Sequence, residues 1–311
     1  MKYTFGIDVG GTNIKLGLFS VMPFVLLEKR EIITPQLDHT ISIFKTILEH
    51  INELLCKYLI DDNNVIGVGL AVPCPVKDGF ISVCPNLQWS NLNVIESMKQ
   101  WLPPHYRVVV SNDANIAAYG ENYTLDRPFK NAIFYTLGTG VGGGIIANGQ
   151  IVEGRTGSGG EIGHMPIFET DETCGCGKKG CLEQVCGTKG ILNYARFLSK
   201  NINSTIDFSN LSVKAVFDAA KNNDEIGLKV LDRVAYYLAQ SASILAVSLD
   251  PDIVIIGGGI AKVGQILIDR ITYYYQKNAR FGTHDVPFVL AKTGNDAGII
   301  GAAKYMFNHT T

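Results

Sequence analysis

The order of apolar and polar positions along the chain predicts alternating strands and helices. Strands are expected where short apolar runs are bounded by glycine, proline or asparagine, and helices where apolar residues recur every three or four positions. The first half contains two such strands around a glycine turn in residues 4–19, a helix over 40–59, strands over 65–72 and 107–110, and a helix from Ala114. This succession indicates mixed α/β layers.

The second half repeats the opening pattern. FGIDVGGTNIKLGL and IFYTLGTGVGGGII both read as strand, glycine turn, strand, and because only two copies occur they indicate a duplicated unit rather than a solenoid. Further strands are expected over 150–153 and 252–256, with a long buried helix over 224–249 between them. Asn295 or Asp296 is expected to cap a closing helix.

Length and composition bound the class of protein. The 311 residues are about twice the usual domain length of roughly 150, and apolar residues at 46% exclude a disordered chain. The 27 basic and 29 acidic residues give a net charge of -2, without the basic surplus of a nucleic-acid surface. The longest apolar run, 21–27, is too short to span a bilayer, and no signal peptide is visible, so we expect a cytoplasmic protein without membrane or nucleic-acid partners.

Three glycine-rich segments are candidates for binding a nucleotide. In the first, Asp8, Gly10, Gly11, Thr12, Asn13 and Lys15 belong to a turn whose N–H groups are able to face a phosphate, with Asp8 holding a metal-bound water. A strand follows these glycines, which excludes a Walker A loop and leaves an ordinary hairpin turn as the alternative.

The second segment consists of Gly138, Thr139 and Gly140 with the glycines after them, and it matches the dinucleotide fingerprint formally. Because a strand follows here too, we favour a second phosphate turn over an NAD site. The third, Gly257, Gly258 and Gly259, permits close approach of a base or sugar, or forms a tight strand-to-helix turn.

Asn112 and Asp113 lie between an apolar strand and a helix, at the sheet edge where ligands collect in open α/β folds. A carboxylate there is suited to accept the proton of a sugar hydroxyl during phosphoryl transfer, which makes Asp113 the candidate general base. Capping of the helix is the alternative role, because Asn and Asp are both favoured N-cap residues.

His164 with Cys174, Cys176 and Cys181 supplies one imidazole and three thiolates, a complete tetrahedral zinc set. Four protein ligands leave no open coordination position, so the zinc is expected to be structural. The other cysteines have no such spacing, and we interpret them as buried small hydrophobes: Cys56, Cys74, Cys84 and Cys186.

Taken together, six segments resemble the ROK family of sugar kinases, and their order and spacing are most similar to those of the bacterial glucokinases. The segments are DVGGTNIK at 8–15, SNDAN at 111–115, LGTGVGGG at 137–144, GEIGH at 160–164, CGCGKKGCLE at 174–183 and IIGGG at 255–259. The resemblance covers nearly the whole chain.

This resemblance implies the actin-like ATPase (ribonuclease H-like) fold, with two α/β domains and a cleft between them. We expect a small domain from residues 1–115 plus 296–311 and a large domain from 116–295 that carries the zinc loop. The resemblance also implies an ATP-dependent hexose kinase that uses Mg²⁺, and we expect a homodimer.

The resemblance assigns roles to residues at matching positions. It places the first and second glycine segments near phosphates or Mg²⁺ and Gly257 to Gly259 near adenosine. The residues expected around the sugar are Asn86, Asn112, Asp113, Glu161, His164 and Glu183. One ring nitrogen of His164 would bind zinc while the other faces a sugar hydroxyl, so the metal loop would position the sugar pocket.

The identity of the hexose is the open question. Where family members often have Pro-Gly-Pro, this chain has Cys74 between two prolines, and the glycine-rich residues 157–160 are compatible with room for an N-acetyl group. We expect a glucokinase, with an N-acetylmannosamine or N-acetylglucosamine kinase as the alternative. A sugar-binding regulator of the same family is the non-enzyme alternative, although the phosphate turn begins at Asp8 and leaves no room before it for a DNA-reading domain.

Overall fold

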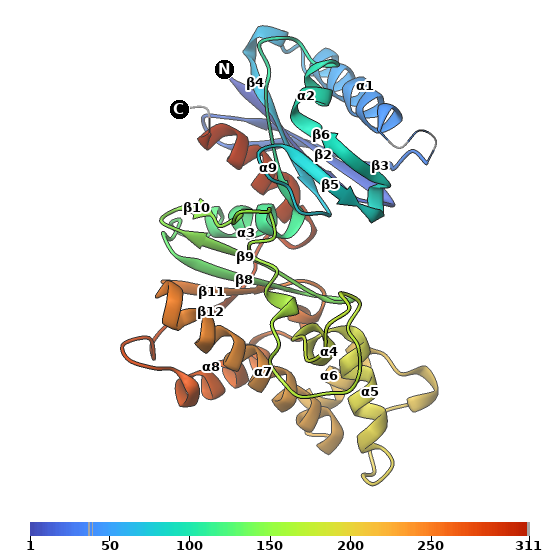
Figure 1. Cartoon of the computed structure of the whole chain (residues 1–311), viewed down its shortest axis with the longest axis vertical. Coiled ribbons are helices and arrows are strands. Elements are labelled where there is room, and N and C mark those ends of the chain that lie inside the picture. Colours follow the sequence, from blue (N-terminus) through green and yellow to red (C-terminus); the bar gives the residue numbers. More distant parts are fainter. Residues whose placement is uncertain (37, 39, 310–311) are drawn as a thin grey trace. The chain divides into compact units, whose positions relative to one another are not determined.

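The computed structural model describes residues 1–36, 38 and 40–309, which form two compact units (Figure 1). Unit 1 comprises residues 1–127, 151–159 and 295–311, and unit 2 comprises 128–150 and 160–294. The division expected from the sequence placed the first boundary at residue 115. Helix α3 (Asp113–Tyr123) runs through that position and packs on helix α9 (Ala297–Asn308), so the whole of α3 belongs to unit 1.

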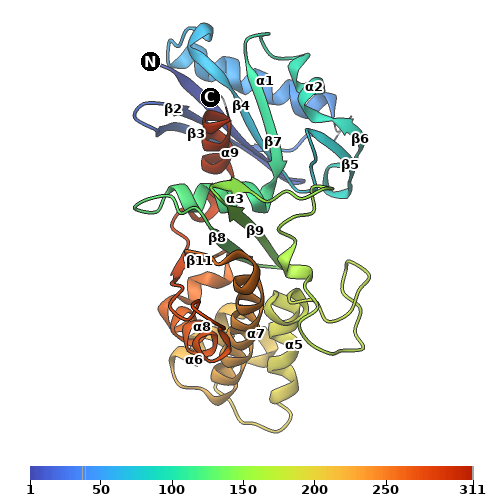
Figure 2. The same ribbon diagram turned by 60° about the vertical axis from the view of Figure 1, so that its left-hand side comes forward.

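Unit 1 is built on a five-stranded sheet in the order β3-β2-β1-β4-β7. Its strands are β1 (Tyr3–Val9), β2 (Asn13–Ser20), β3 (Val25–Ile33), β4 (Val65–Val72) and β7 (Arg107–Asn112). The first three are antiparallel, and β4 and β7 run parallel to β1. Apolar side chains of β1 and β2 pack with those of helix α1 (Ile41–Lys57), whereas α3 and α9 pack on other buried side chains of the sheet. Figures 1 and 2 show the ribbons of these helices beside the sheet.

A small hairpin and a short helix complete unit 1 between β4 and β7. They are β5 (Phe80–Cys84), β6 (Trp89–Asn93) and α2 (Val94–Lys99). Trp89 is buried and packs on Phe44 of α1, so the hairpin extends the core on the α1 side.

Unit 2 repeats the strand plan of unit 1. Its sheet has the order β10-β9-β8-β11-β12, in which β8 and β9 are antiparallel and β11 and β12 continue in parallel from β8. The strands are β8 (Ala132–Leu137), β9 (Val141–Ala147), β10 (Gln150–Ile151), β11 (Ile253–Gly257) and β12 (Phe288–Leu290). The duplicated strand, glycine turn, strand unit is therefore confirmed.

Helices supply most of the core of unit 2. They are α4 (Glu183–Cys186), α5 (Thr188–Leu198), α6 (Val213–Lys221), α7 (Glu225–Leu249) and α8 (Gln265–Asn278). The long helix α7 has the bounds expected from its apolar spacing, with Asp224 as its N-cap accepting a hydrogen bond from Gly227 N–H. It packs with α8 and with buried residues of β8 and β11 in one hydrophobic cluster (Figure 2).

The strands and helices that the apolar pattern predicts are present, but the edge strands β3 and β12 and the helices α5, α6 and α8 were not predicted. Strand β3 alternates exposed and half-buried side chains at a sheet edge, and β12 has only three residues. The closing helix does begin after Asp296, but the Asp296 carboxylate makes no capping hydrogen bond. It pairs instead with Lys29 Nζ at 2.7 Å.

The interpretation of the isolated cysteines needs correction. Cys74 and Cys84 are buried, as expected, but they are joined in a disulfide with a Cα–Cα distance of 5.3 Å. Cys56 is exposed on α1, so it is not a core residue, whereas Cys186 is buried as predicted. Cys84 ends strand β5, and the β5–β6 hairpin brings it to the loop that holds Cys74. The spacing of the two cysteines in the sequence did not indicate this pairing.

Within the described ranges, none of the helices is both long enough and apolar enough to cross a membrane.

The disulfide yields a stability prediction. Because it closes a short loop, with a sequence separation of 10, replacing both cysteines by alanine should lower the free energy of unfolding by about 2–3 kcal/mol. Urea unfolding in non-reducing buffer measures this, with Cys56→Ala as the control because Cys56 is exposed and unbonded. Equal stability of the double variant and the wild type, or seven titratable thiols in the denatured wild type, would contradict the assignment.

Candidate functional site

The first glycine turn joins β1 to β2 and is held by hydrogen bonds on its carbonyl groups. Gly10 N–H donates to Asn13 O at 3.0 Å, and the Thr34 hydroxyl donates to Gly10 O at 2.6 Å. Thr34 N–H donates to Thr12 O at 2.8 Å. The turn is therefore a hairpin turn held by Thr34, the residue that follows β3.

Asp8 is the second-last residue of β1 and pairs with Lys15 across the hairpin, with 3.9 Å between Lys15 Nζ and Asp8 Oδ2. Burial raises the pKa of the Asp8 carboxyl, and the charge of Lys15 offsets this only in part. Lys15 also donates to Asn295 O at 3.2 Å, while Asn13 Nδ2 donates to Glu31 at 3.0 Å. A carboxylate beside the predicted phosphate turn has the oxygen chemistry to hold Mg²⁺ or its bound water, whereas the Asn13 side chain is engaged by Glu31.

Asn86, expected near the sugar, lies against this same turn. A Cβ atom on Gly11 would be 2.7 Å from Asn86 O, so only glycine allows the two backbones to approach this closely. Asn86 sits in the short turn Pro85–Leu87, directly after the disulfide-bonded Cys84.

The junction of β7 and α3 separates the two roles considered for Asn112 and Asp113. Asn112 Oδ1 accepts hydrogen bonds from Ala114 N–H at 3.0 Å and Asn115 N–H at 3.1 Å, which makes Asn112 the N-cap. Asp113 is the first helical residue, half-buried, and its Oδ1 contacts Ala114 N–H at 2.7 Å. The cap therefore does not require Asp113.

The second glycine turn, between β8 and β9, is supported by α5 and by Glu183. Thr188 donates to Gly138 O through its N–H at 3.1 Å and its hydroxyl at 2.9 Å. Glu183 Oε2 accepts from Val141 N–H at 3.2 Å, and a Cβ on Gly140 would lie only 1.9 Å from this oxygen. The predicted phosphate turn and a predicted sugar residue are thus in contact within unit 2.

A cavity of about 430 Å³ in unit 2 connects the second and third glycine segments. Gly138 and Thr139 line one part and Gly259 another. Its remaining walls are Thr188, the apolar side chains of Val213, Phe217, Ile260 and Val263, and the charged side chains of Lys214, Asp218, Lys221 and Lys262. Sequence reasoning missed the walls from α6, because apolar residues at helical spacing signal a core face rather than a cavity.

Gly257, Gly258 and Gly259 form the tight turn that was the alternative to a ligand contact. Gly258 has a positive φ of 85°, and the chain continues into a short helix at Ile260–Val263. Because Gly259 also lines the cavity, the turn is compatible with both interpretations.

The side chains of His164, Cys174, Cys176 and Cys181 converge, with all four potential ligand atoms within 4.8 Å of one another. Cys174 Sγ is 3.7 Å from His164 Nδ1, and Cys176 Sγ is 3.6 Å from Cys181 Sγ. Bonds of about 2.3 Å from a tetrahedral zinc require ligand separations of about 3.7 Å. Donor set and spacing therefore fit a zinc ion, with Nδ1 as the ring nitrogen of His164 directed at the cluster.

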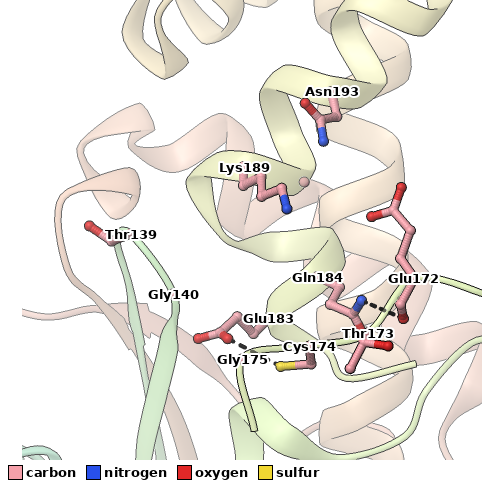
Figure 3. A pocket seen from close by; sticks show the side chains of 11 residues that line it. Thr139, Gly140, Glu172, Thr173, Cys174, Gly175, Glu183, Gln184, Lys189 and Asn193 are labelled. Carbon is pink, nitrogen blue, oxygen red and sulfur yellow. Dashed lines mark hydrogen bonds between the residues drawn. The ribbon is translucent and has the colours of Figure 1, made fainter. Parts of the chain in front are cut away.

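Glu183 links this cluster to the second glycine turn. Figure 3 shows its carboxylate beside the thiol of Cys174, with 3.4 Å between Cys174 Sγ and Glu183 Oε1. Both line a cavity of about 250 Å³ with Thr139, Lys189 and Asn193. Glu161 is exposed at the start of the short turn Ile162–His164, and its carbonyl oxygen accepts a hydrogen bond from His164 N–H at 3.1 Å.

Comparison with known proteins identifies the family. The sequence model of the ROK family matches residues 4–308, and the chain belongs to this family. Its two matching sheets form the actin-like ATPase fold, which confirms the fold expected from the sequence.

Individual relatives match over almost their full lengths. A glucokinase from Halalkalibacterium halodurans is 36% identical, covering 96% of this chain and 93% of that protein. An N-acetylmannosamine kinase from Vibrio cholerae is 30% identical, covering 96% and 98%. Among solved structures, a ROK family glucokinase from Streptomyces griseus, in complex with glucose and AMPPNP, matches with a TM-score of 0.72 at 27% identity, covering 97% and 98%.

Proposed function

We propose that this protein is a glucokinase, which transfers the γ-phosphoryl group of ATP to the 6-hydroxyl of glucose. Assignment as a sugar kinase rests on membership in the ROK family and on kinase relatives that match almost the whole chain. The observation that carries the choice of glucose is the 36% identity with a glucokinase over 96% of the chain.

The proposed chemistry assigns one role to each group of residues. The residues proposed to bind sugar hydroxyls, which are each donor and acceptor, are Asn86, Asn112, Glu161, His164 and Glu183. The two glycine turns hold the phosphates, and the 430 Å³ cavity with Gly259 takes the adenosine. Bound Mg²⁺, held through Asp8, would neutralise charge on the phosphate oxygens.

Asp113 is the proposed general base. Its carboxylate takes the proton of the sugar 6-hydroxyl as that oxygen bonds to the γ-phosphorus and the bond to the leaving ADP oxygen breaks. Support comes from its place at the first turn of α3, next to an N-cap that Asn112 already provides.

Asp113→Asn tests this role, since the amide keeps the shape and loses the proton acceptor. We expect kcat to fall by at least about 100-fold while glucose affinity changes little, because general-base catalysis contributes roughly 10²–10⁴-fold. Steady-state kinetics and calorimetric titration with glucose measure the two quantities. The exposed Asp269→Asn on α8 is the control. Near-wild-type turnover of folded Asp113→Asn would remove Asp113 from the mechanism.

The two sequence features that had left the hexose open have an explanation in the packing of unit 1. The Cys74 side chain is 3% exposed and bonded to Cys84, so it lies within the core of unit 1. Gly157 has a φ of +81°, and a Cβ there would be 2.3 Å from Val76 O. A Cβ on Gly159 would be 2.1 Å from Val152 O. Backbone packing therefore explains these glycines without an N-acetyl group.

A panel of sugars tests the substrate. ADP release should give the highest kcat/KM with glucose, by about tenfold or more over mannose, fructose, allose, N-acetylglucosamine and N-acetylmannosamine, because buried polar groups reject sugars that leave them unpaired. A preference for N-acetylmannosamine would support the alternative that the 30% identical relative suggests. Sugar binding without any ADP release would favour the regulator.

We also propose one structural zinc ion per chain, bound by His164, Cys174, Cys176 and Cys181. Burial raises the pKa of the Cys181 thiol to about 12, and a bound divalent cation reverses this preference by stabilising the thiolates. The ion would order the loop that presents Cys174 to Glu183.

Removal of the zinc should weaken sugar binding before nucleotide binding, since His164 and Glu183 are proposed sugar ligands. Elemental analysis should find one zinc per wild-type chain and less in Cys176→Ser. Calorimetry should show reduced glucose affinity for that variant, with Cys56→Ser, outside the cluster, as the control. A zinc-free protein with full activity would refute the proposal.

A further inference from the structure

We propose that Asn115 is a positioning residue for sugar binding. Its buried side chain holds the segment 153–159, which leads directly into Gly160 and the proposed sugar ligand Glu161. This inference rests on the proposed function, which it deepens by adding a residue with no role in the chemistry itself.

The contacts of Asn115 fix one orientation of its amide. The residue is 1% exposed, and its Nδ2 donates to Gly159 O at 3.1 Å. Among the described residues its Oδ1 has no hydrogen-bond partner. Rotating the amide by half a turn would place Oδ1 against Gly159 O, and two acceptor oxygens form no hydrogen bond. The hydrogen bond to Gly159 therefore requires the NH₂ group of Asn115 as the donor.

A second anchor holds the other end of the segment. The Ser111 hydroxyl, 1% exposed, donates to Glu153 Oε1 at 2.9 Å. Gly159 N–H donates to Glu153 O at 2.8 Å, which closes the segment into a compact loop. Gly157 contacts the backbone of Val76 between the two anchors.

The two anchors flank the proposed sugar residues in the sequence. In the stretch Ser111 to Asn115, the outer residues hold the loop, while Asn112 and Asp113 between them are assigned to sugar and catalysis. The same junction of β7 and α3 therefore positions the base and orders the loop. Glycine-rich loops lose much conformational entropy on ordering, so anchors made before the sugar arrives reduce the cost of binding.

Asn115→Asp tests the proposal because it preserves the shape and replaces the donor by an oxygen facing Gly159 O. We expect KM for the hexose to rise about ten- to hundredfold, with kcat at saturating hexose and KM for ATP within about twofold. Hydrogen exchange should become faster in residues 153–159. If Asn115 only stabilised the fold, the substitution would change the KM values for hexose and for ATP alike.

Glu153 supplies a matched pair in case Asn115→Asp does not fold. Glu153→Ala removes the acceptor of the Ser111 hydroxyl and should raise KM for the hexose severalfold. Glu153→Gln keeps an acceptor oxygen and should stay close to the wild type. Equal behaviour of these two variants would overturn the proposal.

The proposal would also be overturned by folded Asn115→Asp with unchanged hexose KM, or with equal increases in the KM values for hexose and ATP. Failure of the proposed function gives a different result, since the wild type would then prefer another sugar to glucose or phosphorylate none. In that case, hydrogen exchange of residues 153–159 in Asn115→Asp and Glu153→Ala still decides whether the side chains hold the loop. Unchanged hydrogen exchange of residues 153–159 in both variants would overturn the proposal that these side chains hold the loop.

Discussion

Close approach of other chain segments to two glycine turns is the constraint on which the candidate site depends. Gly11 admits the backbone of Asn86 and Gly140 admits the carboxylate of Glu183, at distances that a Cβ atom would prevent. These turns carry the backbone amides proposed to face phosphate. Because Gly11 and Gly140 have no side chain, the proposed sugar ligands Asn86 and Glu183 lie next to these turns. The same two glycines therefore serve both the proposed phosphate binding and the proposed sugar binding.

In unit 2, Glu183 joins three features that lie apart in the sequence. It accepts a hydrogen bond from Val141 at the glycine turn and contacts Cys174 in the proposed zinc cluster, while starting helix α4. Binding of the proposed zinc would therefore be coupled to the predicted phosphate turn through this one carboxylate.

In unit 1, neighbouring side chains at the junction of β7 and α3 have different roles. Asn112 caps the helix, Asp113 is the proposed general base, and Ser111 and Asn115 hold the adjacent loop. A strand that continues directly into a helix presents these side chains at a sheet edge, and helical geometry keeps their relative positions fixed.

The sequence by itself determined the features that depend on local spacing. The strand over 65–72, the long helix α7, the repeated glycine turns and the convergence of His164 with three cysteines were all predictable, because periodicity and short chain separations encode them. Only tertiary structure paired Cys74 with Cys84, lined a cavity with α6 and brought Asn115 to Gly159. These depend on which distant segments pack together, and no local pattern carries that information.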